Sequence, residues 1–292
     1  MSEVVWDDGS TPEAVKITLL GWLRAGLRGG AMVAVILTGL ALMLLLRLIE
    51  KPLFGLARPI TPWITQAVCR LTLIILGLRL SRSGEQISRR KGAVVANHSS
   101  WLDIFVLNAR KNVYFVSKAE VAGWPGVSWL AKATGTVFIE RDRRQAAAQV
   151  EMFRARLGAG HKLLFFPEGT STDGRRVIAF KTTLFAAFFD PALRDDMHIQ
   201  PVTAIYRAPK GRDARFYGWW GDQAMGPHLA KVLAERRNGS VELIYHDPVK
   251  VADFENRKAL ARYCEQAVRA PLDVALASAE AAGDPVRAPK SA

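Results

Sequence analysis

Apolar side chains are concentrated near the start of the chain, where residues 31–46 include neither a charged nor a strongly polar group. As a helix, this segment would be about 24 Å long, a little less than the ~30 Å hydrocarbon core of a bilayer. Extension to residue 49, with the Arg47 side chain reaching toward the headgroups, brings it near spanning length. The pattern therefore predicts a membrane-attached helix that crosses the bilayer, and an uncleaved helix buried in a protein core is the alternative.

A second apolar stretch, residues 63–80, follows a break at 58–62 that contains two prolines. Gln66, Arg70 and Arg79 interrupt it, which favours a helix lying in the membrane interface over one buried in lipid. The acidic residues before the first stretch argue against a cleaved signal peptide. We therefore expect an amphipathic lead at 1–30 and membrane-associated helices at 31–80.

The pattern changes after residue 80, where short apolar runs alternate with longer helix-like stretches. The runs that we interpret as strands are 93–96, 113–117, 136–139, 162–166, 200–205 and 241–246. Strands that alternate with helices indicate an α/β fold with a largely parallel sheet flanked by helices. We assign this domain to residues 81–270, and we expect the Ala- and Pro-rich tail, 271–292, to be disordered.

Charge adds a constraint on partners, because 40 Lys and Arg outnumber 27 Asp and Glu, for a formal net charge of +13. Such a balance favours a polyanion, which leaves nucleic acid, an anionic membrane and an acidic carrier protein as candidates. The two cysteines, Cys69 and Cys264, have neither disulfide-scaffold nor zinc-site spacing. A reducing, cytoplasm-facing location is the simpler interpretation.

Chemistry-bearing residues first appear directly after the strand 93–96, where residues 97–103 read Asn-His-Ser-Ser-Trp-Leu-Asp. Ser99 or Ser100 is expected to cap the helix 101–109. Asp103 in its first turn can then hold one imidazole nitrogen of His98 and leave the other to accept a proton, as a general base requires. The alternative is a structural cap beside a surface histidine.

A second motif, Phe-Phe-Pro-Glu-Gly-Thr-Ser at 165–171, also follows an apolar strand. Glu168 and Gly169 would place a carboxylate and exposed backbone N–H groups at the sheet edge, where open α/β sheets bind ligands. An ordinary turn is the alternative. His161, His198, His228 and His246 are expected to be structural or exposed.

Other enzyme and binding classes fit less well. The chain has no Gly-x-Ser-x-Gly elbow of a serine hydrolase, and the glycines at 158–160 lack the spacing of a phosphate-binding loop. The basic cluster at 141–144 is interpreted either as a solvated face or as a contact for acidic lipid or a carrier protein, rather than for nucleic acid.

Taken together, these motifs resemble the four blocks of the glycerolipid acyltransferases typified by 1-acylglycerol-3-phosphate acyltransferase. His98 with Asp103 is similar to the first block, residues 135–141 to the second, 166–170 to the third and 200–202 to the fourth. Glu140 stands where the second block usually has Asp. The resemblance covers residues 93–205.

The resemblance implies that His98 is the general base on the acceptor hydroxyl and that Asp103 orients it. It implies no metal, no cofactor and no covalent acyl-enzyme. The implied acceptor-binding residues are Lys118, Arg141, Glu168, Gly169 and Thr170. The implied partners are a lysolipid acceptor, an acyl-carrier protein or acyl-CoA as donor, and an anionic membrane, here the bacterial inner membrane with the catalytic domain facing the cytoplasm.

One departure from the family pattern concerns Ser171, because phosphate-acceptor members usually have Arg after Glu-Gly-Thr. Residues 171–174 and 217–222 look closer to the bacterial branch that acylates lyso-ornithine lipid, a zwitterionic acceptor without phosphorus. Arg175 or Arg176 can substitute for the missing cation, so a phosphatidic-acid-forming enzyme stays the alternative, as does an inactive membrane-surface binding protein. Thr183, where Gly often follows Phe-Lys, is a second departure.

Overall fold

The computed structural model describes residues 6–10, 12–87, 90–123, 127–139 and 146–281. The strands are β1 (Arg79–Ser83), β2 (Gly92–Ala96), β3 (Tyr114–Lys118), β4 (Val137–Ile139), β5 (Lys162–Phe165), β6 (His198–Arg207), β7 (Ser240–Tyr245) and β8 (Val249–Lys250). The α-helices are α1 (Leu19–Phe54), α2 (Thr61–Leu76), α3 (Asp103–Arg110), α4 (Val127–Thr134), α5 (Ala146–Gly158), α6 (Pro191–Arg194), α7 (Met225–Ala234) and α8 (Arg257–Ala281). A 3₁₀ helix, η3, covers Thr182–Phe189.

The described strands form one sheet in the order β1-β7-β6-β2-β5-β3-β4, and β8 pairs with β6. All neighbours along this path are parallel except β6 and β7, so the predicted, largely parallel sheet is confirmed. Because β2, β5 and β6 run in the same direction, the segments that follow β2 and β5 emerge at one edge of the sheet.

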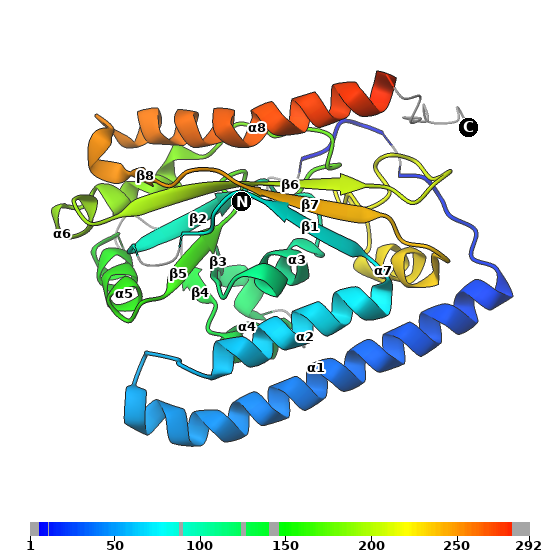
Figure 1. The fold of residues 1–292 in the computed structure, drawn as a ribbon, viewed down its shortest axis with the longest axis horizontal. Coiled ribbons are helices and arrows are strands. Elements are labelled where there is room, and N and C mark those ends of the chain that lie inside the picture. The colour runs from blue at the N-terminus through cyan, green and yellow to red at the C-terminus, as the bar shows by residue number, and fades with distance from the viewer. Residues whose placement is uncertain (1–5, 11, 88–89, 124–126, 140–145, 282–292) are drawn as a thin grey trace.

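Two hydrophobic cores lie on the two faces of the sheet (Figure 1). One core, built with α2, α3 and α7, includes Leu76, Leu107 and Val232. The other, built with α5, η3 and α8, includes Phe153, Phe188 and Cys264. Cys69 and Cys264 are both buried free thiols, as the absence of disulfide spacing predicted.

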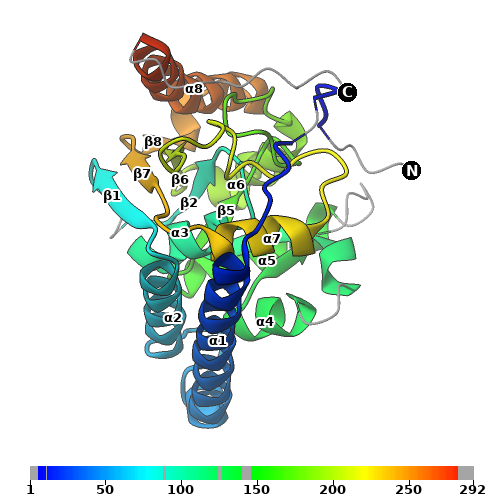
Figure 2. The same cartoon turned by 90° about the vertical axis from the view of Figure 1, so that its right-hand side faces the viewer.

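Helix α1 is the one candidate membrane span among the described residues, by length and composition. Figure 2 shows α1 and α2 side by side beneath the sheet, joined by the predicted proline-containing break. Glu50 stabilises this turn, because its buried carboxylate accepts the backbone N–H groups of Ile60 and Thr61, at 2.8 and 3.1 Å. Helix α1 packs against α7 and α4 of the α/β domain.

Three features differ from the expectations. Helix α1 begins at Leu19, within the stretch 1–30 that was expected to be a separate lead, because the helix continues through the residues that pack on α7. Strand β1 falls across the expected boundary at residue 81, and its polar sequence, Arg-Leu-Ser-Arg-Ser, carries no apolar signal because it is an exposed edge strand. Helix α8 continues through Pro271 to Ala281 rather than ending where we expected disorder. The helix persists because Leu272 is fully buried in the core beneath it.

Candidate active site

His98 lies in the turn that follows β2, at the edge where the parallel strands end. The preceding Asn97 fixes this turn, because its side-chain amide donates to the Ala204 carbonyl at 2.9 Å and accepts the Ala204 N–H at 2.8 Å. The imidazole stacks on Phe166, with ring centroids 4.1 Å apart and planes 10° apart. The turn and the stacking together hold the imidazole in one orientation.

Asp103 begins α3 and is fully buried, with its Oδ2 atom 2.7 Å from Nδ1 of His98. The same oxygen accepts the backbone N–H groups of Ser99 and Ser100, at 2.9 and 3.0 Å. The expected serine cap was wrong, because the Asp103 carboxylate takes these N–H groups and neither serine hydroxyl has a partner among the described residues. The predicted His98–Asp103 contact is present.

A third member of this arrangement, Tyr206 near the end of β6, has no signal in the sequence. Its hydroxyl donates to Oδ1 of Asp103 at 2.6 Å, so both carboxylate oxygens are engaged. Burial and the Asp103 charge raise the pKa of Tyr206 well above that of a free phenol, and the hydroxyl therefore stays a donor. The parallel pairing of β2 with β6 brings the segments that carry the two residues to the same edge of the sheet.

Glu168 joins the two motifs across the sheet edge. Its fully buried carboxylate accepts the backbone N–H of His98 at 2.7 Å and that of Ile178 at 2.9 Å. Burial, with the Asp103 carboxylate as a smaller contributor, raises the pKa of Glu168 to about 8, although the two N–H donors act in the opposite direction. Gly169 has φ of 74°, a conformation that favours glycine over residues with a Cβ.

The structure does not bring two other predicted binding residues, Lys118 and Thr170, into contact with His98 among the described contacts. Thr170 follows Gly169, and its hydroxyl oxygen accepts the backbone N–H of Trp6 at 3.5 Å. Lys118 is half-buried at the end of β3, two strands away from β2. Arg141 and Glu140 lie outside the described residues.

His228 is one of the histidines expected to be structural. It accepts the indole N–H of Trp101 at 2.9 Å and lies 2.9 Å from the Gly218 carbonyl through Nε2. Burial, followed by the nearby Lys231 charge, lowers the pKa of His228 to about 3. The neutral ring therefore bridges the turn after β2 to helix α7.

This arrangement defines an acyltransferase of the glycerolipid type: a histidine oriented by a buried aspartate at the carboxyl edge of the sheet, with a Pro-Glu-Gly-Thr turn beside it. Residues 79–205 match the family described as Acyltransferase. The chain belongs to this family and is an O-acyltransferase.

The names of similar proteins describe a narrower activity than the family description does. The chain is 55% identical to the lyso-ornithine lipid O-acyltransferase of Rhodobacter capsulatus, over 92% of this chain and 97% of that one. It is 33% identical to the enzyme of the same name from Rhizobium meliloti, over 86% of each chain. The fold also matches the crystal structure of the 1-acyl-sn-glycerophosphate acyltransferase from Thermotoga maritima, with a TM-score of 0.55 and 20% identity, covering 85% of this chain and 97% of that one.

Proposed function

We propose that this enzyme transfers a fatty acyl group from a thioester to the free hydroxyl of lyso-ornithine lipid. The observation that carries the chemical part is the 2.7 Å contact between Nδ1 of His98 and the buried Asp103 carboxylate. Because Nδ1 faces Asp103, Nε2 is the nitrogen that can accept the proton of the acceptor hydroxyl. The names of the relatives support the acceptor.

The reaction needs one proton acceptor and one leaving group. As His98 removes the hydroxyl proton, the oxygen attacks the thioester carbonyl and forms a tetrahedral intermediate. Collapse of the intermediate forms the ester, breaks the carbon–sulfur bond, and releases a thiol that takes up the proton from His98. Asp103 holds the imidazole in the orientation that this transfer requires and stabilises its transient positive charge.

The proposed acceptor also agrees with the chemistry at Ser171. Its hydroxyl donates to the Trp219 carbonyl, so this position offers a phosphate no cation. A charge-assisted hydrogen bond contributes about 1.5–3 kcal/mol and a neutral one about 0.5–1.5 kcal/mol. Loss of that cation favours a phosphorus-free acceptor, although acylation of lysophosphatidic acid as a second activity is compatible with the site.

The enzyme is membrane-associated, and we propose that α1 and α2 lie along the surface of the bacterial inner membrane on its cytoplasmic side. Helix α1 has 36 residues, and a helix of that length extends about 54 Å. Since α7 and α4 of the α/β domain both pack on α1, a perpendicular α1 would draw them into the lipid. The exposed apolar residues of α1 and its following turn include Leu37, Leu45, Leu48, Leu53, Phe54 and Leu56.

For the donor, we propose an acyl-carrier protein rather than acyl-CoA. Carrier proteins of this kind are acidic, and the enzyme has a formal net charge of +13. Attraction between exposed charges is screened over about 8 Å at physiological ionic strength. The apparent affinity for the carrier-linked donor should therefore fall more steeply with salt than the affinity for a small acyl thioester, and equal slopes would contradict carrier recognition.

The direct test is thioester-dependent acylation of lyso-ornithine lipid by purified enzyme in mixed micelles. His98→Ala should lower turnover by about a hundredfold to ten-thousandfold, the usual cost of losing a general base. His198→Ala is the matched control, because His198 opens β6 and lies at the opposite end of this strand from Tyr206. Near wild-type turnover by the His98 variant would refute the assignment.

A further inference from the structure

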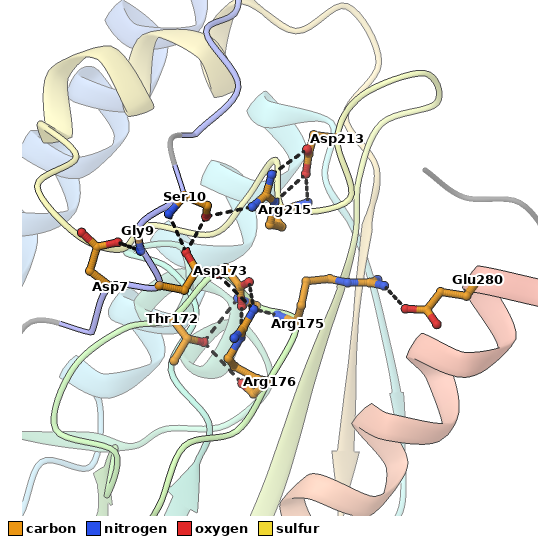
Figure 3. Close-up of polar contacts among 12 residues, drawn as sticks. Asp7, Gly9, Ser10, Thr172, Asp173, Arg175, Arg176, Asp213, Arg215 and Glu280 are labelled. Carbon is orange, nitrogen blue, oxygen red and sulfur yellow. Dashed lines mark hydrogen bonds and ion pairs between the residues drawn. The ribbon is translucent and has the colours of Figure 1, made fainter. Parts of the chain in front are cut away.

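The N-terminal residues Trp6–Ser10 lie against the loop that follows the Pro-Glu-Gly-Thr turn. The backbone N–H of Trp6 contacts the Thr170 hydroxyl at 3.5 Å, and the Trp6 carbonyl accepts the N–H of Gly221 at 3.1 Å. Figure 3 shows this segment beside three arginines that come from two different loops, at 175, 176 and 215. The segment therefore contributes to the surroundings of the loop at 171–176.

This loop is also a direct neighbour of His98. The Thr172 N–H donates to the His98 carbonyl at 2.9 Å, and the Trp219 N–H donates to the Ser99 carbonyl at 2.9 Å. A Cβ atom on Gly174 would lie 3.5 Å from the Ser99 Cβ atom. The loop at 171–176 is therefore adjacent to the turn that carries His98, so one substrate can contact both.

Arg176 is the loop side chain that reaches Trp6–Ser10. Its Nη2 atom lies 2.9 Å from Oδ2 of the buried Asp173 and 3.2 Å from Oδ2 of Asp8, and its guanidinium lies over the Trp6 ring, 4.6 Å from the centroid. Its Nη1 atom has no hydrogen-bond partner among the described residues, and 43% of the side chain is exposed. A bound anion can therefore reach Arg176 without displacing its partners.

The arginines of this cluster are all paired with carboxylates. Arg175 pairs with Glu280 at 3.2 Å, and Arg215 pairs with Asp213 at 3.1 Å. Hydrogen bonds from Ser10 lower the pKa of Asp8, and this carboxylate is ionised at neutral pH, as an ordinary aspartate is. A site with paired charges of both signs suits a zwitterion better than a phosphate monoester, which carries only negative charge.

We propose that Arg176 and Asp8 bind the headgroup of the acceptor, with the guanidinium on its carboxylate and the Asp8 carboxylate on its ammonium group. This inference rests on the proposed function, because it concerns how the same site selects a zwitterionic lysolipid. The N-terminal segment is then part of the acceptor site, and Asp8 determines specificity from a position far from the family motifs.

The test compares acceptors with purified full-length enzyme in mixed micelles. Asp8→Asn should lower kcat/KM for lyso-ornithine lipid relative to lysophosphatidic acid by about fivefold to tenfold, mainly through KM, where tenfold corresponds to about 1.4 kcal/mol. Arg176→Lys, which keeps the positive charge but loses the planar fork, should also raise KM for lyso-ornithine lipid.

Modified acceptors assign each contact to one group. Acetylation of the acceptor's amine should abolish the difference between wild type and Asp8→Asn, and methylation of its carboxylate should abolish the effect of Arg176→Lys. Persistence of either difference with the modified lipid would overturn the corresponding contact. Each comparison sets the modified lipid against the unmodified lipid with the same variant. A loss of folded enzyme would lower both rates equally, so the comparison does not depend on the stability of the variant.

Asp7→Asn is the matched control, since it removes the same charge one residue away and Asp7 contacts the backbone of Gly9. An equal change of preference in this variant would overturn the assignment to Asp8. Increased activity on both acceptors after deletion of residues 1–10 would identify the segment as a cover and overturn the proposal. Wild-type enzyme that acylates neither acceptor would refute the proposed function itself, whereas an unchanged ratio in Asp8→Asn would refute only this inference.

Discussion

Replacement of Tyr206 by phenylalanine should slow catalysis without preventing folding. The substitution removes one hydroxyl, whose hydrogen lies against Oδ1 of Asp103 with an oxygen–oxygen distance of 2.6 Å. The three remaining donors, from His98, Ser99 and Ser100, all contact Oδ2. Oδ1 would therefore lose its partner in a buried site, and the carboxylate would be free to rotate away from the imidazole.

The size of the effect follows from the type of contact. A hydrogen bond to a charged group contributes about 1.5–3 kcal/mol. If about half of a 3 kcal/mol hydrogen bond stabilises the transition state relative to the bound substrate, its removal raises the barrier by about 1.5 kcal/mol. The value of kcat then falls about tenfold, because 1.4 kcal/mol corresponds to one decade. KM for the acceptor should change little, since Tyr206 contacts Asp103 and not the proposed headgroup residues.

The assay is the initial rate of acyl transfer with both substrates varied, together with a thermal unfolding midpoint. Tyr217→Phe is the matched control, because that hydroxyl also makes two buried hydrogen bonds, to Asn238 and to the N–H of Gly239, but does not contact Asp103. Tyr217→Phe should lower the midpoint and leave kcat unchanged. Equal losses of kcat in the two variants, or an unchanged kcat in Tyr206→Phe, would refute the positioning role.

Three further outcomes are expected. Glu168→Gln should lower both stability and turnover, because the N–H groups of His98 and Ile178 contact different oxygens of Glu168 and the NH2 group of an amide cannot accept either of them. A buried unsatisfied donor costs about 1–3 kcal/mol, and wild-type values for both quantities would contradict this. Because burial lowers the pKa of His228 to about 3, the unfolded chain binds a proton that the folded chain excludes, so the unfolding midpoint should fall as the pH drops from about 6.5 toward 3. His228→Gln should flatten that slope, and a slope equal to wild type would point to other groups. Ser171→Arg should raise the relative rate on lysophosphatidic acid in a two-acceptor competition, and an unchanged product ratio would argue against a role for this position.

The strands and the His98–Asp103 contact were predictable because both depend on local sequence. An apolar run of strand length followed by a turn specifies a strand end, and a five-residue separation brings the two side chains within reach at a helix start. Tyr206 was not predictable, because its contact with Asp103 depends on the register of β2 against β6. Strand β1 escaped detection for a different reason, since an exposed edge strand has no buried face to produce an apolar pattern.

The N-terminal contact with the loop at 171–176 was also beyond sequence reasoning. Trp6 and Asp8 precede the apolar helix, in the stretch expected to be an amphipathic lead, and no motif there indicates a role in the site. Their placement depends on tertiary contacts, namely the Trp6 ring on Arg176 and the backbone contact with Gly221. Local propensity carries no information about such pairings.

The attachment of α1 to α7 has a mechanical consequence for any attempt to obtain a water-soluble form of the enzyme. Arg28 of α1 donates to the Leu233 carbonyl at the end of α7, at 3.1 Å, and His228 of the same helix holds the Trp101 indole beside Asp103. Helix α1, which we propose lies on the bilayer, and the turn that carries His98 and Asp103 are thus both attached to α7. Deletion of the residues before Arg58 would remove the contact of α1 with α7 as well as the exposed apolar surface of α1. A variant made soluble in this way should therefore hold His98 and Asp103 less firmly in place.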